Sequence, residues 1–239
     1  MRACAVIPAY DAERDVGEVV RAAAALWPCE RGVLVVDDGS RDRTAEVALA
    51  AGATVVRHPE NRGKGAALRT GMEHALAAGF DVAVTIDADG QHPPAEAARL
   101  ITADPDPEAL VLGIRDLRGA GAPRANQISN GISNFFLSLF ARRHFGDTQC
   151  GLRRYPLRRT LSLDVRDDGY AFEAEVILRA VAGRVRIVEV PVEVIYPPEG
   201  QRLTHFDSVR DPARIVTRVL KTLALTGGLR RAPSAPCAP

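Results

Sequence analysis

The sequence is poor in aromatic residues, which make up 5% of its 239 residues, and it has only four cysteines. These are Cys4, Cys29, Cys150 and Cys237, and no two of them form a CxxC pair. Such wide spacing argues against a disulfide scaffold or a zinc knuckle and favours reduced thiols in a cytoplasmic protein. No stretch reaches the ~18 apolar residues that a membrane-spanning helix needs, so an integral membrane protein is not expected.

The chain also has no excess of either charge, because it contains 31 basic and 30 acidic side chains and its net charge is +1. A chain this close to neutrality has no overall field to attract nucleic acid, and we expect no nucleic-acid partner. Apolar residues (46%) and charged residues (26%) occur at the level of ordinary globular domains, and the length allows a sizeable core.

Short apolar runs alternate with helical patterns through the first half of the chain. The expected strands are residues 3–7, 33–36, 53–56, 82–86 and 110–113, and the expected helices are 16–26, 45–51, 64–78 and 94–101. Strands without polar alternation, separated by helices, predict an α/β protein with a mostly parallel sheet covered on both faces.

The second half has longer helical patterns, expected over residues 124–145, 172–182 and 212–225. Two strands are expected at 185–190 and 192–196, with Pro191 marking an edge or a bulge between them. No linker divides the chain, so we expect one domain over residues 1–226 and a disordered tail over 227–239.

Polar and glycine residues follow four of the expected strands: PAY at 8–10, DDG at 37–39, DAD at 87–89 and GIR at 113–115. In open α/β sheets, ligands bind beyond the carboxyl ends of the strands. Asp87 and Asp89 can both approach one divalent cation, and Gln91 adds an amide oxygen, a donor set that suits Mg²⁺ or Mn²⁺. The alternative is a solvated acidic turn. His92 is expected at the surface or just behind such a site.

The segment NRGKGA at 61–66 opens an expected helix. Its glycines allow close backbone approach, and the helix N-terminus with Lys64 favours an anion, although a plain turn is the alternative. A carboxylate of Asp37 or Asp38 can accept from a nucleobase or a ribose hydroxyl, or cap the next helix, where Thr44 is another candidate cap. Neither a Walker A loop nor GxGxxG after a strand is present, which argues against a dinucleotide oxidoreductase.

Four of these segments resemble, in order and spacing, the motifs of inverting glycosyltransferases of family 2 with the GT-A fold. They are VIPAY at 6–10, VVDDGS at 35–40, NRGKG at 61–65 and DADGQ at 87–91. Two later segments, DTQCGLR at 147–153 and GYAFE at 169–173, are similar to the dolichyl-phosphate mannosyltransferase-like branch and its bacterial polyprenyl-phosphate relatives. The resemblance covers roughly residues 3–225.

The resemblance implies a Rossmann-like sheet with a smaller acceptor-side β/α extension, residues 1–115 binding the nucleotide sugar and 116–226 the acceptor. It implies a GDP- or UDP-linked sugar donor and Mg²⁺ or Mn²⁺, with Asp87, Asp89 and Gln91 as metal ligands. The implied nucleotide contacts are Pro8, Tyr10, Glu13, Asp37, Asp38, Lys64, Asp87, Ala88 and Arg115. The implied catalytic residues are Asp89 and Arg202, with Glu173 and Asp147 as candidate bases. Glu13 lies one position later than the family pattern places its glutamate.

Two functions follow as hypotheses. The first is metal-dependent transfer of a sugar to a polyprenyl phosphate, whose oxygen is already ionised and needs no strong base. The second is transfer to a hydroxyl of a small molecule or peptide, for which a carboxylate has to take the proton. Glu173, Glu175 and Asp147 are candidates for that base, or Asp147 caps a turn and the glutamates face solvent. A protein that binds nucleotide sugars without catalysis is a minor alternative.

A basic and an aliphatic face are expected on the helix over residues 212–225. Arg214, Arg218 and Lys221 fall on one side and Val219 and Leu223 on the other. This pattern favours peripheral contact with the inner face of the cell membrane, and the alternative is packing onto the core of the protein itself.

Overall fold

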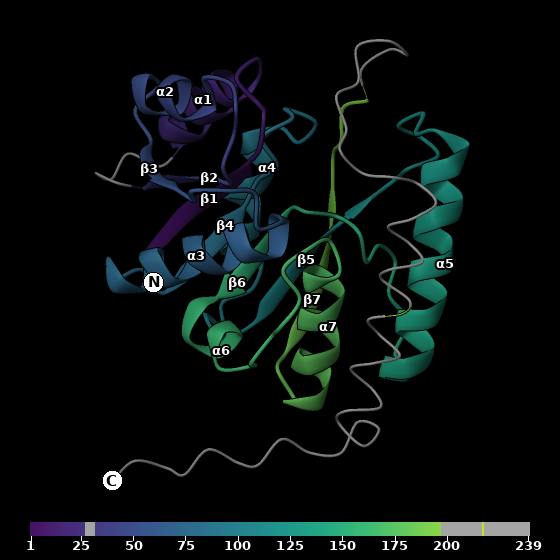
Figure 1. The fold of residues 1–239 in the computed structure, drawn as a ribbon. Coiled ribbons are helices and arrows are strands. Elements are labelled where there is room, and N and C mark those ends of the chain that lie inside the picture. Colours follow the sequence, from purple (N-terminus) through teal and green to yellow (C-terminus); the bar gives the residue numbers. More distant parts are fainter. Residues whose placement is uncertain (27–31, 197–216, 218–239) are drawn as a thin grey trace, which may run out of the picture.

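The computed structural model describes residues 1–26, 32–196 and 217 of the chain. In this part a seven-stranded sheet has the order β3-β2-β1-β4-β6-β5-β7 (Figure 1). The strands are β1 (Ala3–Ala9), β2 (Val33–Asp37), β3 (Thr54–Arg57), β4 (Val82–Thr85), β5 (Leu110–Arg115), β6 (Arg153–Pro156) and β7 (Ile187–Val192). Only β6 runs antiparallel to its neighbours, β4 and β5, so the sheet is mostly parallel as predicted.

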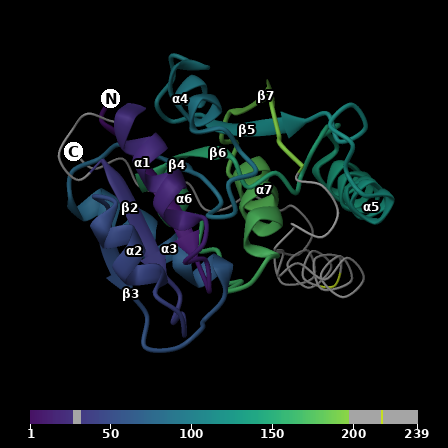
Figure 2. The same ribbon diagram turned by 90° about the horizontal axis from the view of Figure 1, so that it is seen from above.

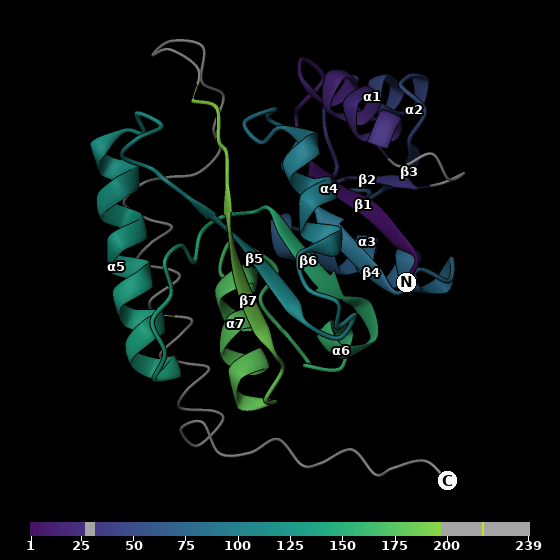
Figure 3. The ribbon, with the colours of Figure 1, turned by 180° about the vertical axis from the view of Figure 1, so that it is seen from behind.

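Helices cover both faces of the sheet because alternate residues of each strand point to opposite sides. On β1, Ala5 and Ile7 pack with α1 (Val16–Leu26), α2 (Thr44–Ala50) and α4 (Pro94–Thr102). Cys4 and Val6 pack on the other side with α3 (Lys64–Ala77), α6 (Leu157–Leu161) and α7 (Phe172–Ala182). Figure 1 shows α1 and α2 on one side of β1–β3 and α3 on the other, and the view from above shows α5 (Arg124–Ala141) at one side of the molecule (Figure 2), as does the view from behind (Figure 3).

Several predicted elements differ from the structure. The two strands expected around Pro191 are one strand, β7, which pairs with β5 alone in the described sheet. An edge strand accepts proline because the missing N–H can face away from the ladder. The long helix ends at Ala141 rather than 145, since Arg142 takes the left-handed conformation at φ 51°. The five-residue helix α6 is too short to show a helical period and was not predicted.

Thr44 does not cap α2 but is its first residue, so that prediction is wrong. Its hydroxyl oxygen instead accepts a hydrogen bond from the backbone N–H of Ala12 at 2.7 Å. This contact ties the segment after β1 to the start of α2.

Apart from residue 217, the helix expected over 212–225 lies outside the described residues, as does the tail expected over 227–239. The single domain over 1–226 and its division at residue 115 stay predictions. Among the helices that the structure does describe, none combines the length and the apolar character needed to cross a bilayer.

Candidate active site

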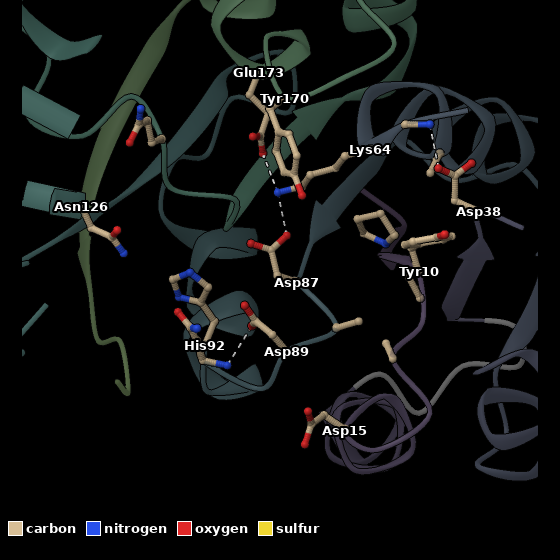
Figure 4. Close-up of a pocket in the computed structure, with 18 of the residues that line it drawn as sticks. Tyr10, Asp15, Asp38, Lys64, Asp87, Asp89, His92, Asn126, Tyr170 and Glu173 are labelled. Carbon is tan, nitrogen blue, oxygen red and sulfur yellow. Dashed lines mark hydrogen bonds and ion pairs between the residues drawn. The ribbon is translucent and has the colours of Figure 1, made fainter. Parts of the chain in front are cut away.

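A cavity of about 510 Å³ lies where the carboxyl ends of β1 and β4 meet the starts of two helices. Tyr10 follows β1, and Asp87 and Asp89 follow β4 (Figure 4). Lys64 is the first residue of α3 and Glu173 the second of α7, and both point into the same space. The sheet therefore brings residues from four separate motifs together, as the rule for parallel strand ends predicts.

Lys64 lies between two carboxylates of this cavity. Its Nζ is 2.8 Å from Asp87 Oδ1 and 3.4 Å from Glu173 Oε1. Burial lowers the pKa of Lys64, but Asp87 and Glu173 outweigh burial and raise it, so the ammonium stays charged. Burial likewise raises the pKa of Asp87, and Lys64 outweighs it and lowers that pKa. The three side chains form one ion-paired group, in which Glu173 is buried and Lys64 and Asp87 are half-buried.

Among the residues that the structure describes, no lysine or arginine forms an ion pair with Asp89. One of its oxygens accepts a hydrogen bond from the backbone N–H of Gln91 at 3.0 Å. Burial, together with the negative charge of Asp87, raises the pKa of Asp89 to about 6. This place in the cavity therefore favours an added positive charge.

A divalent cation fits the oxygen donors found here. Asp87, Asp89 and Gln91 all line the cavity. Within residues 1–26, 32–196 and 217, no three His, Cys, Asp or Glu side chains come together as a metal site. The protein would thus supply only part of a coordination sphere, which is how Mg²⁺ is usually held beside phosphates.

We expect the stability of the metal-free protein to depend on Asp89 in a pH-dependent way. The pKa of Asp89 is raised in the folded state, so its ionised form destabilises the fold as the pH rises from about 4 through 6. Relative to the wild type, Asp89→Asn should gain on the order of 1–2 kcal/mol of unfolding free energy between pH 4.5 and pH 7.5. Urea unfolding in EDTA at the two pH values measures this difference. The same difference at both pH values would show that Asp89 does not titrate in this range.

Asp38 lines the cavity and also anchors the turn in front of α3. Its oxygens accept hydrogen bonds from the backbone N–H groups of Arg62 and Gly63, at 3.0 and 2.7 Å. Its Oδ1 also lies 2.6 Å from Nδ1 of His58. The residue predicted to contact the nucleoside therefore holds the loop that presents Lys64.

Pro8, Tyr10, Lys64, Asp87, Ala88 and Arg115 also line the cavity, as the predicted nucleotide contacts should. The structure does not bring Asp37 and Glu13 there. The carboxylate of Asp37 is buried, accepts from the N–H of Ser40 and pairs with Arg57 at 3.1 Å. Glu13 accepts from the N–H of Arg43 at the surface.

Of the predicted catalytic residues, Asp89 and Glu173 line the cavity and Asp147 does not. Asp147 is buried outside the cavity lining, where its two oxygens accept hydrogen bonds from Arg115 at 2.7 and 3.1 Å. Its carboxylate positions the Arg115 guanidinium, which does line the cavity. Glu173 and Glu175 are both buried, so the expectation that they face solvent is wrong. Glu175 pairs with Arg179, and Arg202 lies outside the described residues.

Four polar residues of the cavity lining were not predicted from the sequence. They are Asn126, Ser133, Thr148 and Gln149, and they line the same cavity as the predicted Arg115 at the end of β5. Ser133 and Thr148 share a hydrogen bond of 2.9 Å between their hydroxyls. Asn126 and Ser133 lie two turns apart on a helix that carries several other polar residues, so the sequence gives no clear signal for them.

His92 is buried in the cavity wall rather than placed at the surface. Its Nε2 lies 4.0 Å from Sγ of Cys150. Burial raises the pKa of the Cys150 thiol to about 12, so this cysteine is neutral and not a nucleophile.

Comparisons with known proteins agree with this geometry. Residues 4–161, more than half of the chain, match the family Glycosyl transferase family 2. The chain is 29% identical over 216 residues to the UDP-N-acetylglucosamine--dolichyl-phosphate N-acetylglucosaminyltransferase of Methanococcus voltae, covering 80% of this chain and 84% of that protein. It is 31% identical over 207 residues to the polyprenol monophosphomannose synthase of Mycolicibacterium smegmatis, covering 80% and 76%.

A solved structure supports the fold. Glucosyl-3-phosphoglycerate synthase from Mycobacterium tuberculosis, in complex with Mn²⁺, UDP-glucose and phosphoglyceric acid, superposes with a TM-score of 0.70. The match covers 98% of this chain and 81% of that one at 19% identity, and it confirms the expected GT-A architecture. By sequence and fold, the chain belongs to glycosyl transferase family 2.

Proposed function

We propose that this protein transfers a sugar, with inversion, from a nucleotide-diphosphate sugar to a polyprenyl phosphate. The observation that carries the proposal is one cavity lined by two unlike sets of side chains. Asp87 and Asp89 form the acidic set, and Arg115 forms the other together with hydroxyl and amide groups. A donor diphosphate with its cation suits the acidic set, and an anionic acceptor suits the set that contains Arg115.

The ion pairs of the cavity support a phosphate acceptor over a hydroxyl. A hydroxyl acceptor needs a carboxylate that is free to take its proton. Of the three candidate bases, Asp147 is held by Arg115 at 2.7 Å, Glu173 has Lys64 at 3.4 Å and Glu175 is held by Arg179 at 2.7 Å. A phosphate oxygen is already ionised and can attack the sugar carbon without such a base.

Mg²⁺ or Mn²⁺ would be held by Asp87, Asp89 and Gln91, and when bound it would neutralise charge on the departing diphosphate. Tyr10 and Pro8 line the part of the cavity next to β1, where the nucleoside would lie. Lys64 keeps Asp87 ionised and turned into the cavity. Arg115, fixed by Asp147, would hold the acceptor phosphate close to the sugar.

The relatives' names agree on the acceptor and differ in the sugar. One relative is named for a dolichyl phosphate and the other for a polyprenol, while the sugars named are N-acetylglucosamine and mannose. We therefore propose a polyprenyl phosphate acceptor, leave GDP and UDP as alternative donor nucleotides, and place the reaction where the protein meets the membrane.

A comparison of acceptors tests the proposal. The purified protein is incubated with Mn²⁺ and a panel of UDP and GDP sugars, and with farnesyl phosphate, farnesol or 3-phosphoglycerate in parallel. We expect an acid-labile sugar phosphate ester of farnesol by mass spectrometry, and no product from farnesol. Transfer to farnesol or to the glycerate hydroxyl, with none to farnesyl phosphate, would overturn the proposal in favour of a hydroxyl acceptor.

A further inference from the structure

Oε1 of Glu173 is a buried carboxylate oxygen at the cavity. Among the residues that the structure describes, none donates a hydrogen bond to this oxygen. Lys64 Nζ lies 3.4 Å from it, about 0.5 Å farther than in a good N–H···O hydrogen bond. A buried acceptor without a donor is costly, and a small movement of Lys64 toward Glu173 would supply the missing donor.

The carboxylate of Asp87, the closer partner of Lys64, has little room to move. Its Oδ1 lies 2.8 Å from Lys64 Nζ. A Cβ added at Gly151 would lie 2.9 Å from the same oxygen and closer still to Oδ2, so the Asp87 carboxylate fills the space beside this glycine. Lys64, in contrast, carries its charge on a flexible four-carbon stem. Of the two partners, Lys64 is therefore the one that can move.

The residue type at position 64 suits a cation that moves. The chain has 31 lysines and arginines in all, and only two of them, Lys64 and Lys221, are lysines. An ammonium is a compact charge that can donate to either of two carboxylates, whereas a guanidinium holds one carboxylate with two parallel hydrogen bonds. Arg115 is held on Asp147 in this second way, by hydrogen bonds of 2.7 and 3.1 Å.

We propose that Lys64 moves from Asp87 toward Glu173 when a divalent cation binds at Asp87 and Asp89. Figure 4 shows the Lys64 nitrogen between the carboxylates of Asp87 and Glu173. Two cations on the Asp87 carboxylate repel each other, and a second carboxylate that accepts the ammonium relieves this repulsion. Glu173 is then a positioning residue, which acts on the metal site through Lys64. The identity of the cation rests on the proposed function, in which it accompanies the donor diphosphate.

Titration of the full chain with Mn²⁺ alone tests this role, with free Mn²⁺ measured by electron paramagnetic resonance. We expect Glu173→Gln to weaken Mn²⁺ binding about tenfold, as is typical when a residue behind a metal ligand is lost. Thermal unfolding in EDTA should stay close to that of the wild type, because Glu173 Oε1 accepts no hydrogen bond from the described part of the chain.

Asp15→Asn is the matched control for the loss of one negative charge. Asp15 also lines the cavity, but its carboxylate pairs with Arg14 at 3.3 Å. Its substitution should change the Mn²⁺ affinity about twofold or less.

Lys64→Arg separates movement from charge. The positive charge is kept, but a guanidinium would hold Asp87 with two hydrogen bonds, so we again expect Mn²⁺ binding to weaken about tenfold. Adding Glu173→Gln to Lys64→Arg should cause little further loss, because both substitutions stop the same movement. Lys221→Arg makes the same substitution at the other lysine and should bind Mn²⁺ like the wild type.

The outcomes separate this role from the reaction. Wild-type Mn²⁺ affinity in Glu173→Gln, or an equal loss in Asp15→Asn, would overturn the inference. So would additive losses in the double variant, or a wild type that does not bind Mn²⁺. The expected pattern in a protein that transfers no sugar to farnesyl phosphate would leave the inference standing and overturn the proposed function. Transfer to farnesyl phosphate by a protein in which Glu173→Gln binds Mn²⁺ normally would do the reverse.

Discussion

Replacing Asp89 by asparagine should lower the rate of sugar transfer about a thousandfold while the protein stays folded. Asp89 lines the cavity beside Asp87, and its raised pKa of about 6 marks a place that lacks positive charge. Asparagine has nearly the same volume but no charge. It would leave the cation of the donor diphosphate with one carboxylate, already shared with Lys64.

Transfer to farnesyl phosphate at saturating Mn²⁺ measures the effect, and thermal unfolding in EDTA checks the fold. Asp164→Asn is the control, because Asp164 is exposed and pairs with Arg166 outside the cavity. Wild-type transfer by Asp89→Asn would remove Asp89 from the metal ligands. Asp87→Asn is a poorer test, because it would also break the half-buried ion pair with Lys64. A loss of activity could then not be separated from a loss of stability.

The part of the site that follows the parallel strands could be predicted from the sequence. Tyr10, Asp87 and Asp89 each stand just after an apolar run, and parallel strands place their carboxyl ends at one edge. The antiparallel direction of β6 could not be predicted in the same way. Its residues RRYP look polar, yet Arg153 and Arg154 are fully buried and donate to backbone carbonyls of distant segments.

The partners of charged residues could not be read from the sequence either. Asp37 and Asp38 are adjacent residues of the same type, and of the two only Asp38 lines the cavity. Successive residues near the end of a strand point to opposite sides, and the sequence does not say which side faces the ligand. Asp147 and Asp89 are likewise both aspartates, but Asp147 is bound by Arg115, which precedes it by 32 residues in the sequence.

The glycines of the NRGKG segment are needed for packing within the protein as well as for the predicted approach to a ligand. They were expected to let the backbone approach a phosphate. In the structure, Gly63 and Gly65 lie against the backbone of residues 167–169, which lead into α7. A Cβ at Gly65 would lie 2.7 Å from the carbonyl oxygen of Asp167. These glycines therefore let α3 and the start of α7 close around Lys64 and Glu173.

Gly63→Ala should accordingly destabilise the protein by about 2–4 kcal/mol, the sum of backbone strain and overlap. Gly63 has φ +99°, and a Cβ there would lie 2.3 Å from the carbonyl oxygen of Asp168. That oxygen accepts a hydrogen bond from the N–H of Ala66, so the clash cannot be relieved without loosening the first turn of α3.

Gly52→Ala separates the two contributions. Gly52 has the same φ of +99°, but a Cβ there would meet nothing within 4 Å. Its substitution should cost about 1–2 kcal/mol from strain alone. Urea unfolding of both variants measures the difference, and transfer assays should show a loss for Gly63→Ala only, because Lys64 is the next residue. Equal destabilisation by the two variants would mean that the contact with residues 167–169 does not require a glycine at position 63. The glycine would then be required by its backbone conformation or by a ligand.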